Sequence, residues 1–379
     1  MERVKSAIAG CGGIAGAHVK GLKLLWENDI KTFEIVSVCD IDEARAEKMA
    51  EDIGSFQGYK PAVYTDVDEM LLKEPDIQAV DICTTHNEHH TVAIKCLSAK
   101  KHVTIEKPLA LTIRYAHMIL DSAEKNRCIL QVAENYRRAL SERTINWVIK
   151  SGRIGKPTML FWEDISERLW YWGWRDHKDI SGGGWTLDGG VHFADLFRYH
   201  IGEVEELYAV SKTYNPIRFK DRDKLSDPVV IDVEDTTMSV LKFENGVTGT
   251  WVLTNSAVGK KTSFRAIYGD KGSIVWDDGL YTREGHISLE KLEEEYLDSL
   301  SSEERERLFP KGIKDTIAIE LKEFFDAILG TGEIETTGEV GLKDEAISMA
   351  VYESSWLNMP VKIKDVEECK VENYQKTLM

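Results

Sequence analysis

Long hydrophobic runs are missing from this sequence. No apolar stretch approaches the roughly 18 to 20 residues needed to cross a bilayer. The first residues, MERVKSAIAGCGG, lead directly into a short apolar strand pattern, so we expect neither a signal peptide nor a membrane segment. The six cysteines form no CxxC pair, which argues against a disulfide framework and against a zinc site. These absences predict a cytoplasmic protein with reduced thiols and no bound metal.

Positive charge is also scarce. The chain has 48 Lys and Arg against 65 Asp and Glu, a formal net charge of -17. Binding to nucleic acid or to an anionic membrane depends on clustered Lys and Arg, so we expect neither partner. Because the chain as a whole is acidic, any phosphate-bearing ligand must be bound by a few local groups rather than by a broad positive surface. With 42% hydrophobic and 30% charged residues the composition is globular, and a length of 379 residues favours two domains.

A glycine turn follows the first apolar segment. Residues 4–9 (VKSAIA) predict a buried strand, and the turn GCGGIAG leads from this strand into a helical pattern. In that setting Gly10, Gly12 and Ala15 match the dinucleotide-binding motif G-x-G-x-x-G/A. Gly10 would allow the tight turn, Gly12 would let a pyrophosphate approach the backbone, and Ala15 would allow close helix packing. The N-terminus of the helix would then bind the phosphates.

An acidic residue follows the second predicted strand at about the spacing this motif requires. Residues 34–40 (EIVSVCD) end on Asp40, which lies 25 residues after Ala15, where about 20 is typical. Asp40 would accept hydrogen bonds from the adenine ribose, and Asp42 would repel the 2′-phosphate of NADP. Arg45 is a nearby cation that would favour NADP instead. The sequence therefore predicts NAD as the cofactor, with NADP less favoured.

Strand and helix patterns continue to alternate up to residue 137. Such alternation predicts an N-terminal dinucleotide-binding domain, residues 1–137, with a doubly wound parallel Rossmann sheet. Polar side chains follow strands 79–85 and 102–108, at the edge where ligands bind. For His86 and His90, helix capping or partial exposure is as plausible as cofactor contact. We expect the cofactor to contact Gly10, Gly12, Gly13, Ile14, Ala15, Asp40, Ile41, Arg45, Thr84, Thr85, His86, Asn87, His90, Glu106 and Lys107.

The second half of the chain is rich in long strand patterns. After GRIGKP (152–157), successive β runs with little helix between them predict a separate α+β domain, residues 138–379, with a large open, mainly antiparallel sheet. Residues 289–308 form a charged amphipathic segment that predicts a solvated helix. Two further helical patterns, near 314–329 and 342–356, complete this half of the chain.

One helical segment of this half carries residues suited to proton transfer. In 181–202 (SGGGWTLDGGVHFADLFRYHIG), Asp188 and His192 lie four residues apart and so on one helix face. Gly189 and Gly190 would leave space for a ligand beside them. A histidine can take or give a proton near neutral pH. Two alternatives remain: a capping acid with an ordinary interior histidine, or a metal site completed by Asp195 or His177.

Aromatic residues crowd the segment before this helix. Trp and Tyr combine a flat apolar face with a polar edge, which suits a sugar ring, although some of these residues must belong to the core. Arg175 could contact substrate hydroxyls or a cofactor phosphate, or pair with Asp176 or Asp179. The aromatic residues are Trp162, Trp170, Tyr171, Trp172, Trp174 and Trp185.

With GCGGIAG, IEKP, GRIGKP and GGGWTLDGGVHFADL in this order, the chain resembles the Gfo/Idh/MocA family (glucose-fructose oxidoreductase, inositol dehydrogenase, MocA) from about residue 3 to 362. The resemblance implies an N-terminal Rossmann domain and a C-terminal domain whose open sheet builds homodimers or homotetramers. It also implies that Lys107, Asp188 and His192 are catalytic. The substrate residues that we expect are Lys107, Tyr136, Trp172, Arg175, Asp188 and His192.

The chain departs from the family pattern at several positions. Family members commonly have a proline and an asparagine after the fourth strand, where this chain has Thr85 and His86 followed by Asn87. Trp185 and Gly190 also stand where small or aliphatic residues are common. The first departure changes residues expected to line the nicotinamide pocket. The second changes residues expected to determine which substrate shape fits.

These observations lead to one hypothesis about function. It is NAD-dependent hydride transfer between nicotinamide and a secondary hydroxyl or carbonyl of a sugar, an inositol-like polyol or a sugar derivative. His192 would be the general base, Lys107 would stabilise charge on the substrate oxygen, and Asp188 would orient this group. The alternatives are an NAD-dependent glycosidase or sugar-interconverting enzyme with transient oxidation, and a non-catalytic dinucleotide-binding regulator.

Overall fold

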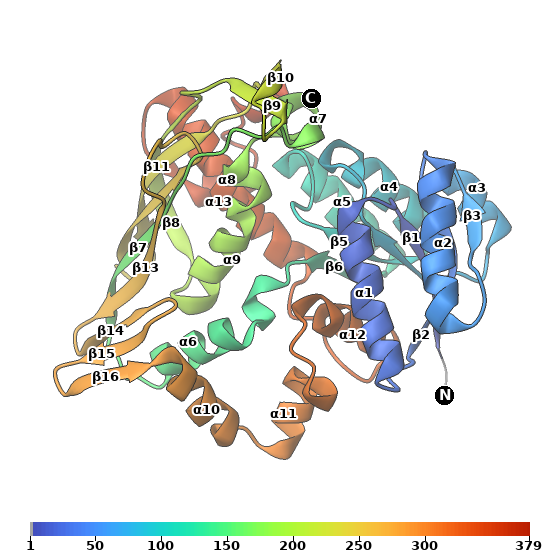
Figure 1. Ribbon diagram of the computed structural model, residues 1–379, viewed down its shortest axis with the longest axis horizontal. Coiled ribbons are helices and arrows are strands. Elements are labelled where there is room, and N and C mark those ends of the chain that lie inside the picture. The colour runs from blue at the N-terminus through green and yellow to red at the C-terminus, as the bar shows by residue number, and fades with distance from the viewer. Residues whose placement is uncertain (1–2) are drawn as a thin grey trace. The chain divides into compact units, whose positions relative to one another are not determined.

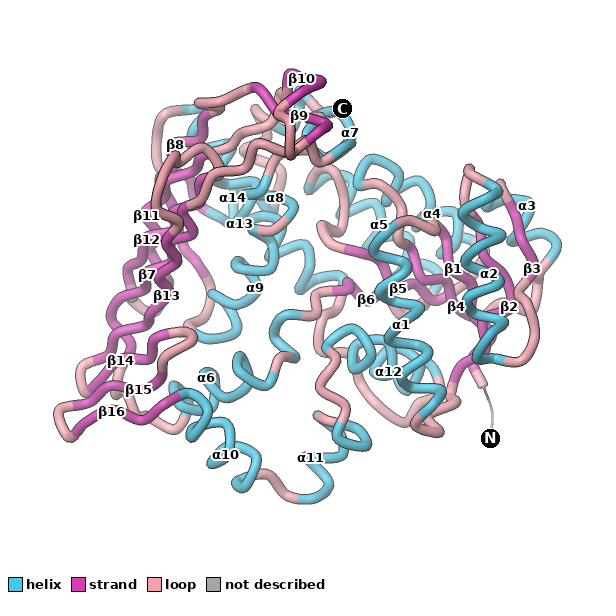
Figure 2. The backbone as a smooth tube through the Cα atoms, viewed as in Figure 1, coloured by secondary structure: helices cyan, strands magenta, loops and turns pink. Residues whose placement is uncertain are grey.

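The computed structural model describes residues 3–379, which separate into two compact units (Figures 1 and 2). The first unit contains the chain up to Arg138 together with Glu303–Leu342. The second contains Ala139–Ser302 and Lys343–Met379. The sequence division after residue 137 placed residues 303–342 in the second domain, whereas in the structure they pack with the first unit. The physical reason is the packing of a late helix against the first one, described below.

Six parallel strands form the sheet of the first unit. Their order, β3-β2-β1-β4-β5-β6, reverses direction between β1 and β4, which is the arrangement of a dinucleotide-binding Rossmann sheet. The predicted doubly wound parallel sheet is therefore confirmed. Its strands are buried on both faces, because helices cover each side. The strands are β1 (Val4–Ala9), β2 (Phe33–Cys39), β3 (Ala62–Tyr64), β4 (Ala79–Ile82), β5 (His102–Glu106) and β6 (Leu130–Ala133).

Most helices of this unit connect successive strands. Helix α12 (Thr316–Ile328), in contrast, comes from a much later part of the sequence. It packs against α1 (Gly13–Glu27). A Cβ atom on Gly21 of α1 would lie 3.1 Å from the backbone nitrogen of Ala318, so the glycine permits this close approach. The other helical segments are α2 (Glu43–Gln57), α3 (Val67–Lys73), η1 (His86–Glu88), α4 (His89–Ser98), α5 (Ile113–Asn126), η2 (Tyr136–Arg138) and η4 (Pro310–Gly312).

Nine strands form the large sheet of the second unit, in the order β16-β15-β14-β13-β7-β12-β11-β8-β17. Among the described residues of this sheet, β7 and β12 are the one parallel pair and the other pairs are antiparallel, so the prediction of a mainly antiparallel sheet is confirmed. A separate hairpin is formed by β9 (Ile217–Asp221) and β10 (Ser226–Val230). The sheet strands are β7 (Pro157–Ile165), β8 (Val204–Lys212), β11 (Thr236–Phe243), β12 (Thr248–Thr254), β13 (Thr262–Gly269), β14 (Gly272–Val275), β15 (Gly279–Thr282), β16 (Gly285–Ser288) and β17 (Val361–Lys362).

One face of this sheet forms the core of the second unit. Trp162 of β7 and Trp251 of β12 are fully buried and lie in register as neighbours. Both indole rings pack against Phe197, with ring centroids 5.2 and 5.4 Å away. Helices α9 (Gly190–His200) and α13 (Gly338–Leu357) lie on this side of the sheet (Figure 1). The remaining helical segments are α6 (Leu140–Lys150), η3 (Gly173–Asp176), α7 (Lys178–Ser181), α8 (Trp185–Asp188), α10 (Leu289–Ser299), α14 (Ile363–Glu367) and η5 (Gln375–Thr377).

The charged segment 289–308 differs from its prediction as one helix. It forms α10, which ends at Ser299, and a second helix α11 (Ser302–Leu308). Ser302 opens the second helix, and the division between the two compact units falls directly after it. Within residues 3–379, no helix is both long enough and apolar enough to span a membrane.

Candidate active site

The glycine turn between β1 and α1 has the geometry that a bound dinucleotide requires. Gly10 has φ = 92°, and a Cβ atom there would lie 2.6 Å from the carbonyl carbon of Cys83, so only glycine fits. Around Gly12, in contrast, no described atom lies within 4 Å of a Cβ position. Gly12 caps α1 without a side-chain hydrogen bond to the first helical amides. This helix N-terminus therefore offers N–H groups and open space to a phosphate.

Asp40 ties the end of β2 to the glycine turn. Its Oδ2 accepts the N–H of Cys11 at 2.7 Å and its Oδ1 accepts the N–H of Asp42 at 2.9 Å. Ile41 is 94% exposed. Arg45, which could favour NADP, lies with its Nε 3.2 Å from Oδ2 of Asp42 on the first turn of α2. Arg45 therefore forms an ion pair with the Asp42 carboxylate. Asp40, in contrast, is hydrogen-bonded to the glycine turn at Cys11.

The segments after β4 and β5 are joined by a buried histidine that the sequence analysis did not single out. His89 Nδ1 lies 2.8 Å from the carbonyl oxygen of Pro108, and Nε2 lies 3.3 Å from that of Thr84. Burial lowers the pKa of His89 to about 3. One imidazole therefore holds the loop after β4 beside the loop that contains Lys107.

The predicted cofactor residues after β4 also contact one another. The Thr85 hydroxyl donates to Oδ1 of Asn87 at 2.7 Å. His86 is buried, and His90 stacks on Tyr115 with ring centroids 4.0 Å apart. The stacking gives His90 a packing contact with α5, and its contact with the cofactor stays a prediction.

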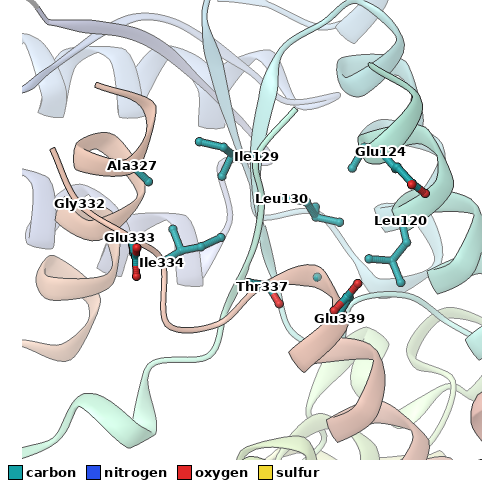
Figure 3. Close-up of a pocket in the computed structure, with 12 residues that line it drawn as sticks. Leu120, Glu124, Ile129, Leu130, Ala327, Gly332, Glu333, Ile334, Thr337 and Glu339 are labelled. Carbon is teal, nitrogen blue, oxygen red and sulfur yellow. The ribbon is translucent and has the colours of Figure 1, made fainter. Parts of the chain in front are cut away.

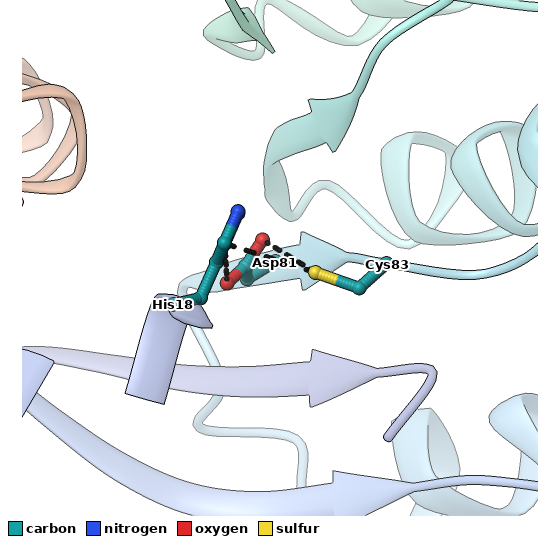
Figure 4. A group of neighbouring side chains, drawn as sticks. All are labelled: His18, Asp81 and Cys83. Carbon is teal, nitrogen blue, oxygen red and sulfur yellow. Dashed lines mark hydrogen bonds and ion pairs between the residues drawn. The ribbon is translucent and has the colours of Figure 1, made fainter. Parts of the chain in front are cut away.

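Glu106 connects Lys107 to a buried charge network. Its Oε2 accepts the backbone N–H of Lys107 at 3.2 Å, and its Oε1 lies 3.0 Å from Nε2 of His18. Nδ1 of His18 lies 2.8 Å from Oδ2 of Asp81 (Figure 4). Burial alone would lower the pKa of His18, but the Asp81 carboxylate holds that pKa well above its usual value. His18 is therefore a buried imidazolium between two carboxylates. It holds the Glu106 carboxylate, which accepts the backbone N–H of Lys107.

His18, Asp81 and Cys83 also form the one group within residues 3–379 whose ligand atoms are close enough to hold a metal ion (Figure 4). Both ring nitrogens of His18 already face carboxylate oxygens, and burial raises the pKa of the Cys83 thiol. In the structure these three side chains form a hydrogen-bonded network, with Sγ of Cys83 lying 3.6 Å from Oδ1 of Asp81. The metal site considered for Asp188 and His192 is not assembled among the described residues.

The helical segment expected over 181–202 is interrupted. Helix α8 ends at Asp188, and α9 begins at Gly190. A Cβ atom on Gly189 would lie 2.6 Å from the ring of Trp185, and one on Gly190 would lie 2.9 Å from the ring of Trp251. The interpretation that these glycines make room for a ligand is therefore wrong, because indole rings fill that space.

Asp188 pairs with Arg175 beside two tryptophans. Arg175 Nε donates to Oδ1 of Asp188 at 2.9 Å, and its guanidinium lies 5.1 and 4.3 Å from the ring centroids of Trp172 and Trp174. Asp188 is 4% exposed and His192 is 7% exposed. The expected alternative partners of Arg175, Asp176 and Asp179, were wrong.

Arg168 explains why Asp176 is not available to Arg175. Its guanidinium donates to both carboxylate oxygens of Asp176, at 2.6 and 3.0 Å, and contacts the rings of Trp170 and Trp172. Trp162 belongs to the core. The ring centroids of Trp185 and Trp172 are 5.7 Å apart.

The sequence held one signal for the residues that were missed. Asp81 lies inside the apolar strand AVDIC, and a carboxylate in a buried strand requires a partner of opposite charge. Nothing in the sequence pattern identifies that partner as His18, which lies 63 residues earlier. His89 had no such signal, because its two partners are backbone carbonyl groups.

A separate open pocket of about 790 Å³ lies in the first unit (Figure 3). It is lined by α5, β6 and residues 327–339, with Leu120, Leu130 and Ile334 forming apolar walls. None of the predicted site residues lines it.

Comparison with known proteins identifies the family. A model of the Gfo/Idh/MocA oxidoreductase family, NAD-binding Rossmann fold, matches residues 4–134. The model of the C-terminal alpha/beta domain of the same family matches residues 148–363. The chain therefore belongs to the Gfo/Idh/MocA family of oxidoreductases, and its first sheet is the NAD-binding Rossmann fold of that family.

Similar proteins match three quarters of the chain or more. Levoglucosan dehydrogenase of Pseudarthrobacter phenanthrenivorans is 28% identical over 334 residues, 76% of this chain and 82% of that protein. Myo-inositol 2-dehydrogenase of Thermotoga maritima is 27% identical over 377 residues, 96% of this chain and 99% of that protein.

Solved structures share the fold. An oxidoreductase domain protein from Kribbella flavida, 22% identical, has a TM-score of 0.79 and covers 96% of this chain and 100% of its own. Levoglucosan dehydrogenase in complex with NADH, 24% identical, has a TM-score of 0.76 and covers 96% and 99%.

Proposed function

We propose that this oxidoreductase transfers a hydride between NAD and a secondary hydroxyl or carbonyl of a sugar, polyol or sugar derivative. The observation that carries the proposal is the ion pair of the buried Asp188 with the partly exposed Arg175, whose guanidinium lies against the faces of Trp172 and Trp174. Such a site combines polar groups for hydroxyls with flat apolar surfaces for a ring. Two similar proteins, named for levoglucosan and myo-inositol, support the same class of substrate.

The first unit would hold the cofactor, and the second would supply most of the substrate contacts. The N-terminus of α1 beside Gly12 would bind the pyrophosphate, and Asp40 would bind the adenine ribose. NAD supplies or accepts the hydride when it is bound. Nothing in the turn blocks this placement, because the space beside Gly12 is open among the described residues.

Three side chains would act on the substrate hydroxyl. Lys107 would donate a hydrogen bond to the substrate oxygen and stabilise the negative charge that develops there. His192 would take the hydroxyl proton at a ring nitrogen. Asp188 would orient the reacting group, and Arg175 would hold this carboxylate in place. Tyr136, which is 37% exposed at the end of the first unit, would contribute a substrate contact.

Replacement of Lys107 by Met tests this assignment. The side chain keeps its length and loses its charge, so kcat should fall at least about a hundredfold while the Kd for NAD changes little. The measurements are NADH formation at saturating substrate and a fluorescence titration with NAD. Lys125→Met, an exposed substitution on α5, is the matched control and should behave as wild type. Turnover near that of wild type in Lys107→Met would contradict the catalytic role.

The same assay separates the proposal from its alternatives. A dehydrogenase accumulates NADH in proportion to substrate, whereas an enzyme with transient oxidation turns over substrate without net NADH. A panel of cyclic polyols, aldoses and aldose lactones, each with NAD in excess, would identify the substrate. We further propose a cytoplasmic homodimer or homotetramer; the six cysteines are all free thiols in the structure.

A further inference from the structure

We propose that the C-terminal tail, residues 370–379, positions Asp188 by holding the glycine loop Gly182–Gly184 that precedes it. The inference rests on the proposed function, because the chemical role of Asp188 belongs to that function. The tail lies beyond residue 363, where the match to the family model ends. The contacts that carry the proposal all lie within the second unit.

The tail is anchored to α13 through a buried carboxylate. Glu353 is fully buried, and it accepts the backbone N–H groups of Tyr374 at 3.0 and 3.1 Å and of Gln375 at 3.2 Å. The Gln375 side-chain amide donates to the same carboxylate at 3.4 Å. Tyr374 stacks on Tyr352 of α13, with ring centroids 4.6 Å apart and planes 12° apart. A carboxylate that receives several N–H donors holds a chain segment firmly.

From this anchor the tail reaches the segment that leads into the glycine loop. The Tyr374 hydroxyl donates to the carbonyl oxygen of Gly182 at 2.8 Å. Lys178, the first residue of α7, donates through Nζ to the Thr377 hydroxyl at 2.7 Å. The same ammonium lies 4.2 Å from the centre of the Tyr374 ring. The tail therefore contacts both α7 and the loop that follows it.

The loop has little freedom on its other sides. A Cβ atom on Gly183 would lie 2.3 Å from the Tyr352 hydroxyl. One on Gly184 would lie 2.4 Å from the carbonyl oxygen of Glu234. The Glu234 carboxylate accepts the N–H groups of Gly184 and Thr186 at 2.7 and 2.9 Å. The tail, α13 and Glu234 thus each contact the loop, and Tyr374 supplies the contact at Gly182.

Movement of the loop would pass directly to Asp188. The backbone N–H of Asp188 donates to the carbonyl oxygen of Gly184 at 3.0 Å, within the single turn of α8. A four-residue helix cannot support itself, so its position depends on its contacts. Arg175 then binds the carboxylate that α8 presents. Tyr374 is therefore a positioning residue. It acts on Asp188 through two hydrogen bonds, its own to Gly182 and that of the Asp188 N–H to Gly184.

Tyr374→Phe in the 379-residue chain tests the proposal. The substitution keeps the ring stack on Tyr352 and removes only the hydrogen bond to Gly182. We expect the amides of residues 182–188 to exchange with deuterium about three- to tenfold faster, since one hydrogen bond is lost. On the best sugar or polyol, kcat should fall several-fold while the Kd for NAD and the thermal midpoint stay close to wild type. Lys376→Ala, an exposed tail residue paired with Glu372, is the matched control and should change none of these.

Removal of residues 371–379 is the second variant, and it should increase both effects. Unchanged exchange over residues 182–188 in Tyr374→Phe would overturn the contact between tail and loop. Faster exchange with a wild-type kcat would overturn the positioning role. A wild-type protein that forms no NADH with any sugar or polyol would contradict the proposed function instead. The exchange experiment would still support or reject the tail's hold on the loop in that case.

Discussion

At the scale of single residues, Asp40 connects the local structure to the choice of cofactor. Each of its carboxylate oxygens accepts one backbone N–H, from Cys11 or from Asp42. A carboxylate oxygen has a second acceptor position, so Asp40 can bind a ribose hydroxyl without losing either bond. The two backbone bonds fix its direction in advance. A 2′-phosphate beside it would place like charges together.

We predict that the wild-type protein binds NAD at least about tenfold more tightly than NADP, a difference of about 1.4 kcal/mol. Asp40→Ser should weaken NAD binding and narrow the preference, because the hydroxyl offers fewer acceptor positions and carries no charge. Titration of both variants with NAD and NADP measures this. Leu72→Ser, at a 76% exposed position of α3 outside the predicted cofactor residues, should leave the preference unchanged. Equal or tighter NADP binding by the wild type would mean that Arg45 sets the choice.

His18 gives the protein a pH-dependent stability of definite sign. Its folded-state pKa lies well above the unfolded value near 6.5, so the folded state binds more protons than the unfolded state above that pH. The stabilisation is complete below about pH 6.5 and is lost as pH rises through the folded-state pKa, at up to about 1.4 kcal/mol per pH unit.

His18→Gln should remove this pH dependence and lower stability at neutral pH by about 3 kcal/mol or more, because Asp81 and Glu106 would remain buried without their cation. Urea unfolding between pH 6 and pH 8 measures both effects. His286→Gln, at a half-exposed site, is the control and should keep the wild-type slope. A His18→Gln variant that keeps the wild-type pH slope would contradict the charge assigned to His18.

At the scale of elements, α12 shows how a segment far along the chain completes the first unit. Besides its contact with α1 at Gly21, it accepts a hydrogen bond from the Gln131 side chain at the carbonyl oxygen of Glu320, at 3.0 Å. Arg138, fully buried after β6, donates to Glu323 of the same helix. These contacts bind α12 to the sheet by both apolar packing and ion pairing. The helix therefore stabilises the fold that holds the dinucleotide.

The large sheet of the second unit is an element with one face covered and one face open. Met238 and Val240 of β11 are 55% and 57% exposed. In register beside them, Val210 and Tyr208 of β8 are each 38% exposed. Among the described residues, no helix covers this face (Figure 1). A contiguous apolar face of this kind is suited to association with another protein surface.

At the scale of the whole molecule, this face should make the protein a homodimer or homotetramer. We predict that the double substitution Met238→Lys and Val240→Lys shifts the protein to monomers, because charges would be buried at the interface without partners. Light scattering after size-exclusion chromatography measures the mass. Leu72→Lys, at a 76% exposed position of α3, is the control and should keep the wild-type mass. A monomeric wild type at micromolar concentration would contradict the proposal.

Much of the architecture followed from the sequence alone. The Rossmann sheet was predictable because strand and helix periods, the glycine turn and the acid after β2 are all local signals. The order of strand patterns in the second half likewise predicted a mainly antiparallel sheet. The short strands β9, β10, β15, β16 and β17 were not predicted, since segments of two to five residues carry little periodicity.

Only the tertiary structure decided which distant residues meet. The return of residues 303–342 to the first unit depends on a helix contact with α1, and the helical pattern near 314–329 does not specify its partner. Indole rings, rather than a ligand, occupy the space beside Gly189 and Gly190. Arg175 pairs with Asp188 rather than with an acidic residue adjacent in sequence. The physical reason is common to all three. Periodicity and turn chemistry act over a few residues, whereas packing and charge pairing are settled between segments that only the folded chain brings together.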